Sequence, residues 1–244
     1  MALKVVLKLN ERRIENRGVK PLIGSGIASS VALTRTTKDY LMFRILACLL
    51  SAIALSGCAL ISDTVDIQYH STTATAPLLG AGQVRVEVAV NDGRTGRPDQ
   101  IGVKKNGYGM EMAPILASRP VPDLVRDALV LELRKEGFDI GPGGMIVVVD
   151  VTKFSNDFKM GFFSGDAASE AILGVQVRNP AGRIVYSRTI AGDNSTGGVF
   201  IAGGDNAKAS LERSLSNAIA KLMADPAFSR AILDTARGPI KFSS

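Results

Sequence analysis

An apolar run that ends at a cysteine divides this 244-residue chain into two parts. The run reads FRILACLLSAIALSGCAL over residues 43–60, and its apolar centre, residues 45–57, is 13 residues long. A helix that crosses a bilayer needs about 20 apolar residues, so this run is too short to remain in a membrane. A charged start, a short apolar middle and small residues at the exit are typical of a secretory signal. We therefore expect residues 42–57 to be a signal peptide that begins at Met42.

The exit of the run, Leu55-Ser56-Gly57-Cys58, resembles the bacterial lipobox. In that motif the chain is cut between the residues at the positions of Gly57 and Cys58, and acyl chains such as palmitate are attached to the cysteine. A buried core helix that holds a cysteine is the alternative, but such a helix needs neither the charged start nor the abrupt exit. The lipobox predicts that Cys58 anchors the protein to a membrane. By analogy with enteric sorting, Ala59 after it predicts the outer membrane, because an Asp there retains a lipoprotein in the inner membrane.

Residues 1–41 precede this signal and are set aside from the fold. They show no clear apolar period, and a sound signal begins after them, so we expect an upstream extension that is not translated. Two alternatives stay open: a genuine long leader, or a cytoplasmic tail on a segment that is not cleaved.

The charge of the chain points to no nucleic acid partner. The whole chain has 29 Lys and Arg and 23 Asp and Glu. Residues 1–57 contain nine of these basic residues and three of these acidic residues. Residues 58–244 therefore contain 20 basic and 20 acidic residues. A basic excess in the mature chain would have indicated a polyanionic partner.

Catalytic residue types are scarce in the mature chain. Its one cysteine is the expected lipid site, and His70 is the single histidine of the whole chain. Neither a Ser-His-Asp triad nor a zinc site can be built from these residues, and His70 reads as an exposed linker residue. Five carboxylates could pair for acid–base chemistry, but their spacing indicates only solvated strand ends and turns: Asp150, Asp157, Asp166, Glu170 and Asp193. We expect no enzyme, no cofactor and no metal.

Apolar periodicity predicts the fold. Apolar and polar residues alternate at residues 83–90 and 171–177, which predicts half-buried strands. A return strand is expected at residues 183–190, and a short strand at residues 101–105. The unbroken run at 145–151, extended through 159, predicts a central strand covered on both faces. Helical spacing after Pro120 and before Asp225-Pro226 predicts two helices, with Gly137 ending the first, and a short terminal helix follows at 227–236. The expected fold is α+β: one mixed or antiparallel sheet of about five strands with two helices on one face.

The expected domain organisation follows from the same patterns. Residues 58–82 form a lipidated tether, in which residues 64–69 alternate and could add an edge strand. Residues 83–236 form one domain, and residues 237–244 are a tail.

A glycine-rich loop is expected at residues 192–204, before the second helix. The sequence GGVFIAGGDNAKAS over residues 197–210 suggests a phosphate-binding loop, because Gly198 and Gly203 have the right separation. Gly204 stands where such a loop has its lysine, and Asp205 adds a negative charge, so Asp205 or Asn206 as a helix cap is the better interpretation.

Four phenylalanines gather at residues 154–163, two of them beside a turn. If the turn projects past the helices, Phe162 and Phe163 form an aromatic contact for a partner or a membrane. If the helices reach that far, these rings belong to the core.

The lipobox, VEVAVNDGR (residues 86–94), VRDALVLELRKEGF (residues 125–138) and the Gly-Gly pair before the last helix together resemble the YajG family of small bacterial lipoproteins. The resemblance covers roughly residues 60–233. It implies an outer-membrane lipid anchor and a periplasmic domain, and the only functional residue that it carries over is Cys58.

Three classes of function follow, in this order: a non-enzymatic envelope lipoprotein that binds a protein partner or helps to assemble a complex, a binder of a small envelope ligand, lipid or glycan, and a hydrolase with a carboxylate pair. A shallow surface with exposed aromatics would favour the first class, and a large apolar pocket the second.

Cys58→Ser tests the anchor. We expect the variant to keep its signal peptide and to lose the acyl chains that hold the parent protein, because two or more chains are needed for stable anchoring. The intact mass of membrane-extracted protein measures both changes. An unchanged mass and unchanged membrane association would show that Cys58 is not the lipid site.

Overall fold

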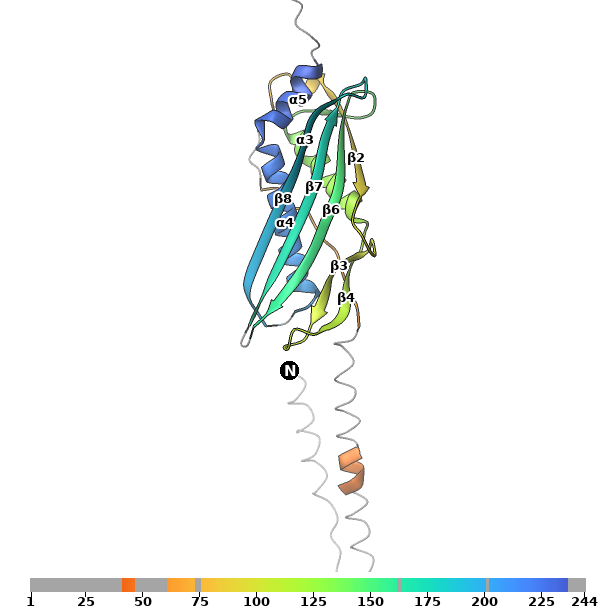
Figure 1. Ribbon diagram of the computed structural model, residues 1–244, viewed down its shortest axis with the longest axis vertical. Coiled ribbons are helices and arrows are strands. Elements are labelled where there is room, and N and C mark those ends of the chain that lie inside the picture. The colour runs from red at the N-terminus through yellow and green to blue at the C-terminus, as the bar shows by residue number, and fades with distance from the viewer. Residues whose placement is uncertain (1–40, 47–60, 73–75, 162–163, 201, 237–244) are drawn as a thin grey trace, which may run out of the picture. The chain divides into compact units, whose positions relative to one another are not determined.

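The computed structural model describes residues 41–46, 61–72, 76–161, 164–200 and 202–236. The chain divides into two units, residues 1–55 and 56–244, and each is described by itself. In the first unit, residues 41–46 are helical. The second unit (Figure 1) contains, in chain order, β1 (Asp63–Val65), the 3-10 turn η3 (Ala81–Gln83), β2 (Arg85–Asp92), β3 (Gln100–Lys105), β4 (Glu111–Ala117), α3 (Val121–Lys135), β5 (Asp139–Ile140), β6 (Met145–Met160), β7 (Gly165–Arg178), β8 (Ile184–Val199), α4 (Gly204–Met223) and α5 (Pro226–Ala236).

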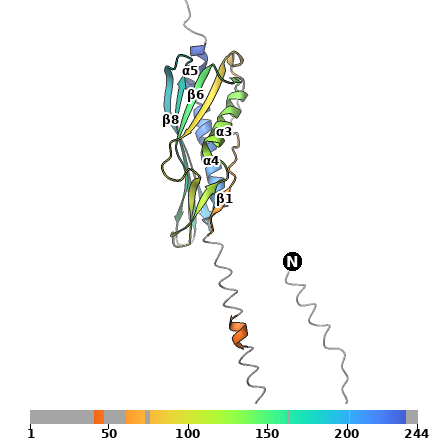
Figure 2. The same cartoon turned by 90° about the vertical axis from the view of Figure 1, so that its right-hand side faces the viewer.

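The main sheet has five strands in the order β5-β2-β6-β7-β8. β2 pairs in parallel with both β5 and β6, whereas β6, β7 and β8 are antiparallel neighbours. A parallel pair needs a crossover connection, and α3 lies in the connection between β2 and β6. Both α3 and α4 lie on the same side of the sheet (Figure 2). The predicted α+β fold, with one mixed sheet of about five strands and two helices on one face, is confirmed.

A second sheet of three strands, in the order β1-β4-β3, adds to the predicted fold. The sequence of β4, EMAPILA, contains a proline and little alternation, so its pattern does not indicate a strand. β1 pairs with it in parallel, and Val65 and Ile67 are buried in the core. Residues expected in the tether 58–82 therefore belong to the folded unit, which begins before residue 83.

A β-bulge in β6 changes which residues face the core, from odd-numbered before it to even-numbered after it. Up to Val151 the odd-numbered side chains are buried, and beyond the register shift between Val151 and Lys153 the even-numbered Phe154 and Phe158 are buried. One extra residue in a strand reverses the faces of all that follow. The prediction that residues 145–151 are covered on both faces is wrong, because Ile146 and Val148 point away from the helices and are only half-buried.

The apolar stripe predicted for α3 is buried, and the helix ends as its sequence indicates. Gly137 has a φ of 94°, its N–H donates to the Arg134 carbonyl at 3.0 Å, and the Phe138 N–H donates to the Leu133 carbonyl at 3.1 Å. These two bonds form a Schellman motif, in which glycine supplies the left-handed residue. Phe138 is buried beside the helix that it closes.

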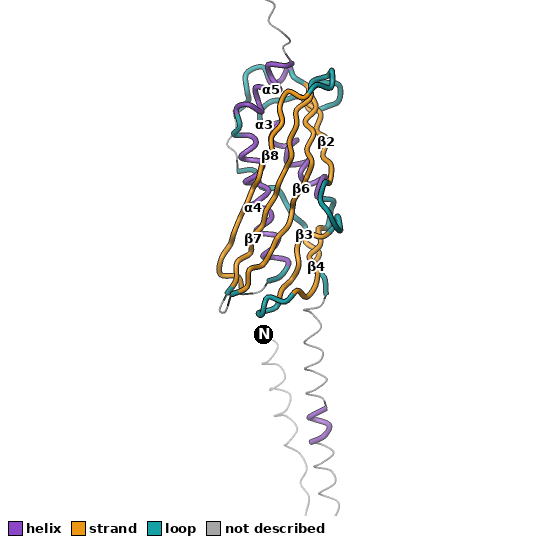
Figure 3. The backbone as a smooth tube through the Cα atoms, viewed as in Figure 1, coloured by secondary structure: helices purple, strands orange, loops and turns teal. Residues whose placement is uncertain are grey.

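α4 runs along β7 and β8 (Figure 3), and a glycine allows the close contact. A Cβ at Gly192 would lie 2.1 Å from the Ser214 carbonyl oxygen and 2.4 Å from the Ala218 nitrogen. The segment 192–204 is predicted to be a loop, but most of it belongs to β8, and Gly192 in it gives room for the helix rather than a turn.

Asp225 joins the end of α4 to β8. Its Oδ2 accepts hydrogen bonds from the Tyr186 hydroxyl at 2.8 Å and the Arg188 guanidinium at 2.7 Å, and its Oδ1 caps α5 through the Ala227 N–H. Burial raises the pKa of this carboxyl, but the hydrogen bonds and the nearby Arg188 charge outweigh burial, so its pKa is lowered. The predicted break before Pro226 is confirmed.

Gly192→Ala tests the contact between α4 and β8. Because the added methyl group meets backbone atoms, the helix or the strand must move, and we expect the free energy of unfolding to fall by at least about 2 kcal/mol. Urea denaturation of the purified protein measures this loss. Gly107→Ala is the matched control, since a Cβ there meets nothing within 4 Å and the change should stay within about 0.5 kcal/mol. Equal effects of the two substitutions would contradict the inferred contact.

Candidate functional site

The face of the main sheet that points away from the helices carries an open groove. Its volume is about 350 Å³. Most of its lining side chains stand at alternate positions of β6, β7 and β8, because the bulge in β6 turns the even-numbered residues to the core and the odd-numbered residues outward. We call this surface the outer groove; it is lined by Lys153, Ser155, Asp157, Lys159, Ala168, Ser169, Glu170, Asp193, Asn194 and Ser195.

Ion pairs between lysines and carboxylates cross or border the outer groove. Lys153 pairs with Glu170 at 2.6 Å, Lys105 with Asp157 at 2.6 Å, and Lys221 with Asp193 at 3.2 Å. The fold thus gathers three of the five carboxylates considered from the sequence. Asp166 is the register partner of Lys159 at the end of the same face, and Asp150 accepts a hydrogen bond from Asn91 further along it.

The pairing limits what these carboxylates can do chemically. Each of the three carboxylates is engaged by a lysine, and such paired charges suit recognition by charge. In the part of the chain that the structure describes, no group of three or more His, Cys, Asp or Glu side chains is placed to hold a metal ion. The outer groove is therefore a surface of mixed charge.

Two α4 side chains protect the exposed edge of β8 beside this groove. The Asn217 amide donates to the Asp193 carbonyl at 2.9 Å, and the Lys221 ammonium donates to the Ala191 carbonyl at 2.8 Å. These carbonyls lie on the open edge of the sheet, where an added strand would pair. Strand addition is blocked at this point, so the face of the sheet is more accessible to a partner than its edge.

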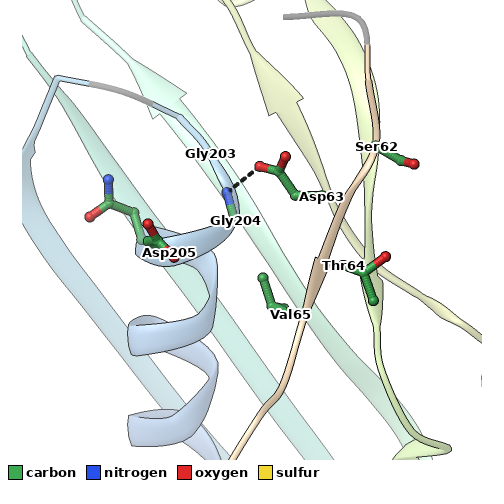
Figure 4. A pocket seen from close by; sticks show the side chains of 8 residues that line it. Ser62, Asp63, Thr64, Val65, Gly203, Gly204 and Asp205 are labelled. Atoms are coloured by element: carbon green, nitrogen blue, oxygen red, sulfur yellow. Dashed lines mark hydrogen bonds between the residues drawn. The ribbon is translucent and has the colours of Figure 1, made fainter. Parts of the chain in front are cut away.

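A second cleft, of about 500 Å³, lies where α4 begins (Figure 4). Asp63 of β1 reaches across it, and its Oδ2 accepts a hydrogen bond from the Gly204 N–H at 2.9 Å. Its Oδ1 pairs with the Lys104 ammonium at 3.0 Å. Burial raises the pKa of Asp63, but the bonds from Gly204 and Lys104 outweigh burial and lower it.

The cap of α4 differs from the predicted one. The helix starts at Gly204, and its cap position, Gly203, has no capping side chain; neither Asp205 nor Asn206 takes that place. The capping carboxylate comes from Asp63, which lies 141 residues earlier. A phosphate at this helix end would compete with that carboxylate, which agrees with the sequence argument against a phosphate loop.

The remaining residues singled out from the sequence lie apart from the outer groove. The His70 side chain is mostly exposed, and its Nε2 is 3.9 Å from a Glu212 carboxylate oxygen. Gly57, Cys58, Phe162 and Phe163 lie outside the described residues. The lipid site and the proposed aromatic contact therefore stay predictions.

A buried pair of acids at the end of α3 was not found from the sequence. Glu132 accepts a hydrogen bond from the Tyr69 hydroxyl at 3.0 Å and lies 3.4 Å from the Lys135 ammonium. Glu136 is almost fully buried, and its Oε2 has no hydrogen-bond partner. Burial, aided by the neighbouring Glu132 charge, raises the pKa of Glu136 to about 7.

Glu136→Gln tests this buried acid. The carboxyl titrates near pH 7 in the folded protein and near 4.5 when unfolded, so its neutral form stabilises the fold below pH 4.5 and this contribution is lost as the pH rises through 7. Glutamine stays neutral at both pH values. We therefore expect the free energy of unfolding of the variant to exceed that of the parent by about 1–3 kcal/mol at pH 8 and to match it at pH 4.5.

Thermal melting at the two pH values measures the difference, and Glu111→Gln on the exposed start of β4 is the control. A gain of the same size at both pH values would contradict the raised pKa of Glu136.

Comparisons with known proteins find solved structures that are similar to this chain at low sequence identity. No curated protein matches it. A Xanthomonas campestris protein of the DUF330 family is 15% identical, with a TM-score of 0.49, and the match covers 72% of this chain and 97% of that one. An Acinetobacter baumannii minor lipoprotein is 9% identical, with a TM-score of 0.38 and coverage of 60% and 94%. A Helicobacter pylori protein described as a putative neuraminyllactose-binding hemagglutinin homolog is 8% identical, with a TM-score of 0.40 and coverage of 71% and 99%.

The sequence itself shows the family. Residues 73–233 match a family described as uncharacterized lipoprotein, and this match spans most of the chain. None of the helices among the described residues is long and apolar enough to cross a membrane. The match over residues 73–233 shows that the chain belongs to this family of uncharacterised lipoproteins.

Proposed function

We propose that the protein is a lipid-anchored envelope protein that holds a protein partner on the open face of its main sheet, without catalysis. Membership of a lipoprotein family supports the anchor. The lipobox at Cys58, the residue Ala59 after it and the resemblance to the YajG family support the finer assignment to the outer membrane, with the domain in the periplasm.

The observation that carries the partner role is the uncovered face of β6, β7 and β8. In the part of the chain that the structure describes, the helices lie on one side of the sheet (Figure 2), and no helix or strand covers the other side of the three long strands. Half-buried Ile146, Val148 and Ile172 lie on this side, and the charged outer groove continues from them along the strands. An aliphatic centre with a polar border is the usual make-up of a protein interface.

The charges of the outer groove define the kind of partner. Lysines alternate with carboxylates across it, and the domain as a whole has no basic excess. A polyanion such as a nucleic acid binds a surface of one sign, whereas a protein can match a mixed pattern. The partner that fits is therefore a protein with charges of both signs.

A small envelope ligand is the second candidate, and the cleft at the start of α4 favours it. Its volume of about 500 Å³ lies within the usual range for ligand pockets. Asp63 and Asp205 line it, so a cationic or hydroxyl-rich ligand fits its chemistry better than an anion.

Charge reversal in the outer groove separates these candidates. Lys153→Glu with Lys159→Glu should abolish partner binding and leave the melting temperature nearly unchanged, because exposed ion pairs contribute only about 0–1 kcal/mol. The measurement is photocrosslinking in the native envelope from a probe at Ser155, followed by identification of the crosslinked protein and a binding assay with that protein purified.

Arg126→Glu with Arg230→Glu, on exposed positions of α3 and α5, is the matched control. Loss of binding in the groove variant alone supports the proposal. Equal binding by both variants, or the absence of any adduct from Ser155, would exclude the open sheet face as the partner site.

A further inference from the structure

Exposed apolar side chains gather at one end of the folded unit. The exposed fraction is 91% for Tyr108, 78% for Phe200, 63% for Ile61 and 59% for Met110. Tyr108 and Met110 lie between β3 and β4, Phe200 follows β8, and Ile61 precedes β1. Figure 1 shows that the tips of β3 and β4, the end of β8 and the start of β1 all lie at the same end of the unit, opposite α5.

Direct contacts hold these segments together. The Lys104 ammonium of β3 donates to the Ile61 carbonyl at 2.9 Å, and the Lys105 N–H donates to the Ala202 carbonyl, two residues after Phe200, at 3.3 Å. The Asn106 side-chain oxygen accepts the N–H groups of both Tyr108 and Met110 at 3.0 Å, which fixes the tip. The four side chains thus belong to connected segments at one end of the unit, and we call them the apolar tip.

The chain length between the apolar tip and the expected lipid site is short. Ile61 follows Cys58 by three residues, and three residues span at most about 11 Å. The polar headgroup layer of a leaflet is several ångströms thick, so an anchored Cys58 keeps Ile61 beside the bilayer surface. The apolar tip is then the part of the unit nearest the lipid.

The charge of the tip suits a neutral lipid surface. Lys104 pairs with Asp63 at 3.0 Å, and Lys105 pairs with Asp157 at 2.6 Å, so carboxylates balance these two lysines at the end of β3. Binding by charge alone would need anionic lipid and unbalanced basic residues. Tyrosine, with an apolar ring and a polar hydroxyl, is favoured at the interface between headgroups and acyl chains.

We propose that the apolar tip, formed by Ile61, Tyr108, Met110 and Phe200, inserts into the headgroup region of the membrane that holds the lipid on Cys58. The domain then touches the bilayer with its own side chains as well as through its acyl chains, which fixes how the sheet stands on the surface. This inference rests on the lipid anchor of the proposed function, and it commits the tip to lipid rather than to a protein.

Single tryptophans give a direct test, because the chain contains none. The probes are Tyr108→Trp and Phe200→Trp in the full chain, purified with its lipid and reconstituted into phosphatidylcholine vesicles with or without bromine on the acyl chains. Ile184→Trp is the matched control: Ile184 is also exposed, but it starts β8 at the opposite end of the unit. Variants whose melting temperature matches that of the parent are compared.

The expected result is emission shifted to shorter wavelength and strongly quenched by brominated lipid for both tip probes, and neither effect for Ile184→Trp. If the protein floats with the vesicles but the tip probes emit like the control, the insertion is wrong while the anchor stands. A wavelength shift without quenching by bromine would mean that a second copy of the chain covers the tip, which also overturns the proposal. If the protein does not float with the vesicles, the anchor and the insertion fail together.

Discussion

The contact between α4 and the β7–β8 pair sets the distance between the helical layer and the sheet. Gly192 brings the backbones of α4 and β8 together, and Ser169, on β7, donates to the Ser210 carbonyl of α4 at 2.6 Å. Other parts of the fold attach to this helix: Asp63 caps its start from β1, and Asp225 fixes its end to β8. The helix is thus fixed to the rest of the unit at both ends and along its length.

Local patterns predicted the elements that depend on neighbouring residues. The stripe of α3, its Gly137 ending and the break at Pro226 follow from helical spacing and from the backbone preferences of glycine and proline, which act over a few residues. The pairing of β1 with β4 and the cap supplied by Asp63 join segments that are far apart in the chain, and no local pattern encodes them. The outer groove depends on a register shift of one residue, which alternation alone does not reveal. The sequence identifies the carboxylates of the groove as candidates, but only the pairing of the strands shows that they lie on one face.

The two proposed surfaces make different contacts: the apolar tip contacts the membrane, and the outer groove contacts a protein partner. The apolar tip lies at the end from which the chain leads back to Cys58, and the outer groove lies on a side of the sheet. A tip in contact with lipid leaves the sheet face accessible from the space beside the membrane, so a partner could bind without displacing the anchor. The buried Glu136 lies at the end of α3 and is part of neither surface; its effect is on stability.

The bulge between Val151 and Lys153 decides where the length of β6 can change. Deleting Thr152 would remove the bulge and leave plain alternation, with Lys153 still facing outward and Phe154 still facing the core. Deleting a residue beyond the bulge, such as Ser155, would instead turn the rest of the strand over, so that Asp157 would face the core and Phe158 would face the solvent. The bulge is therefore a place where β6 can lose one codon without exchanging its inside with its outside.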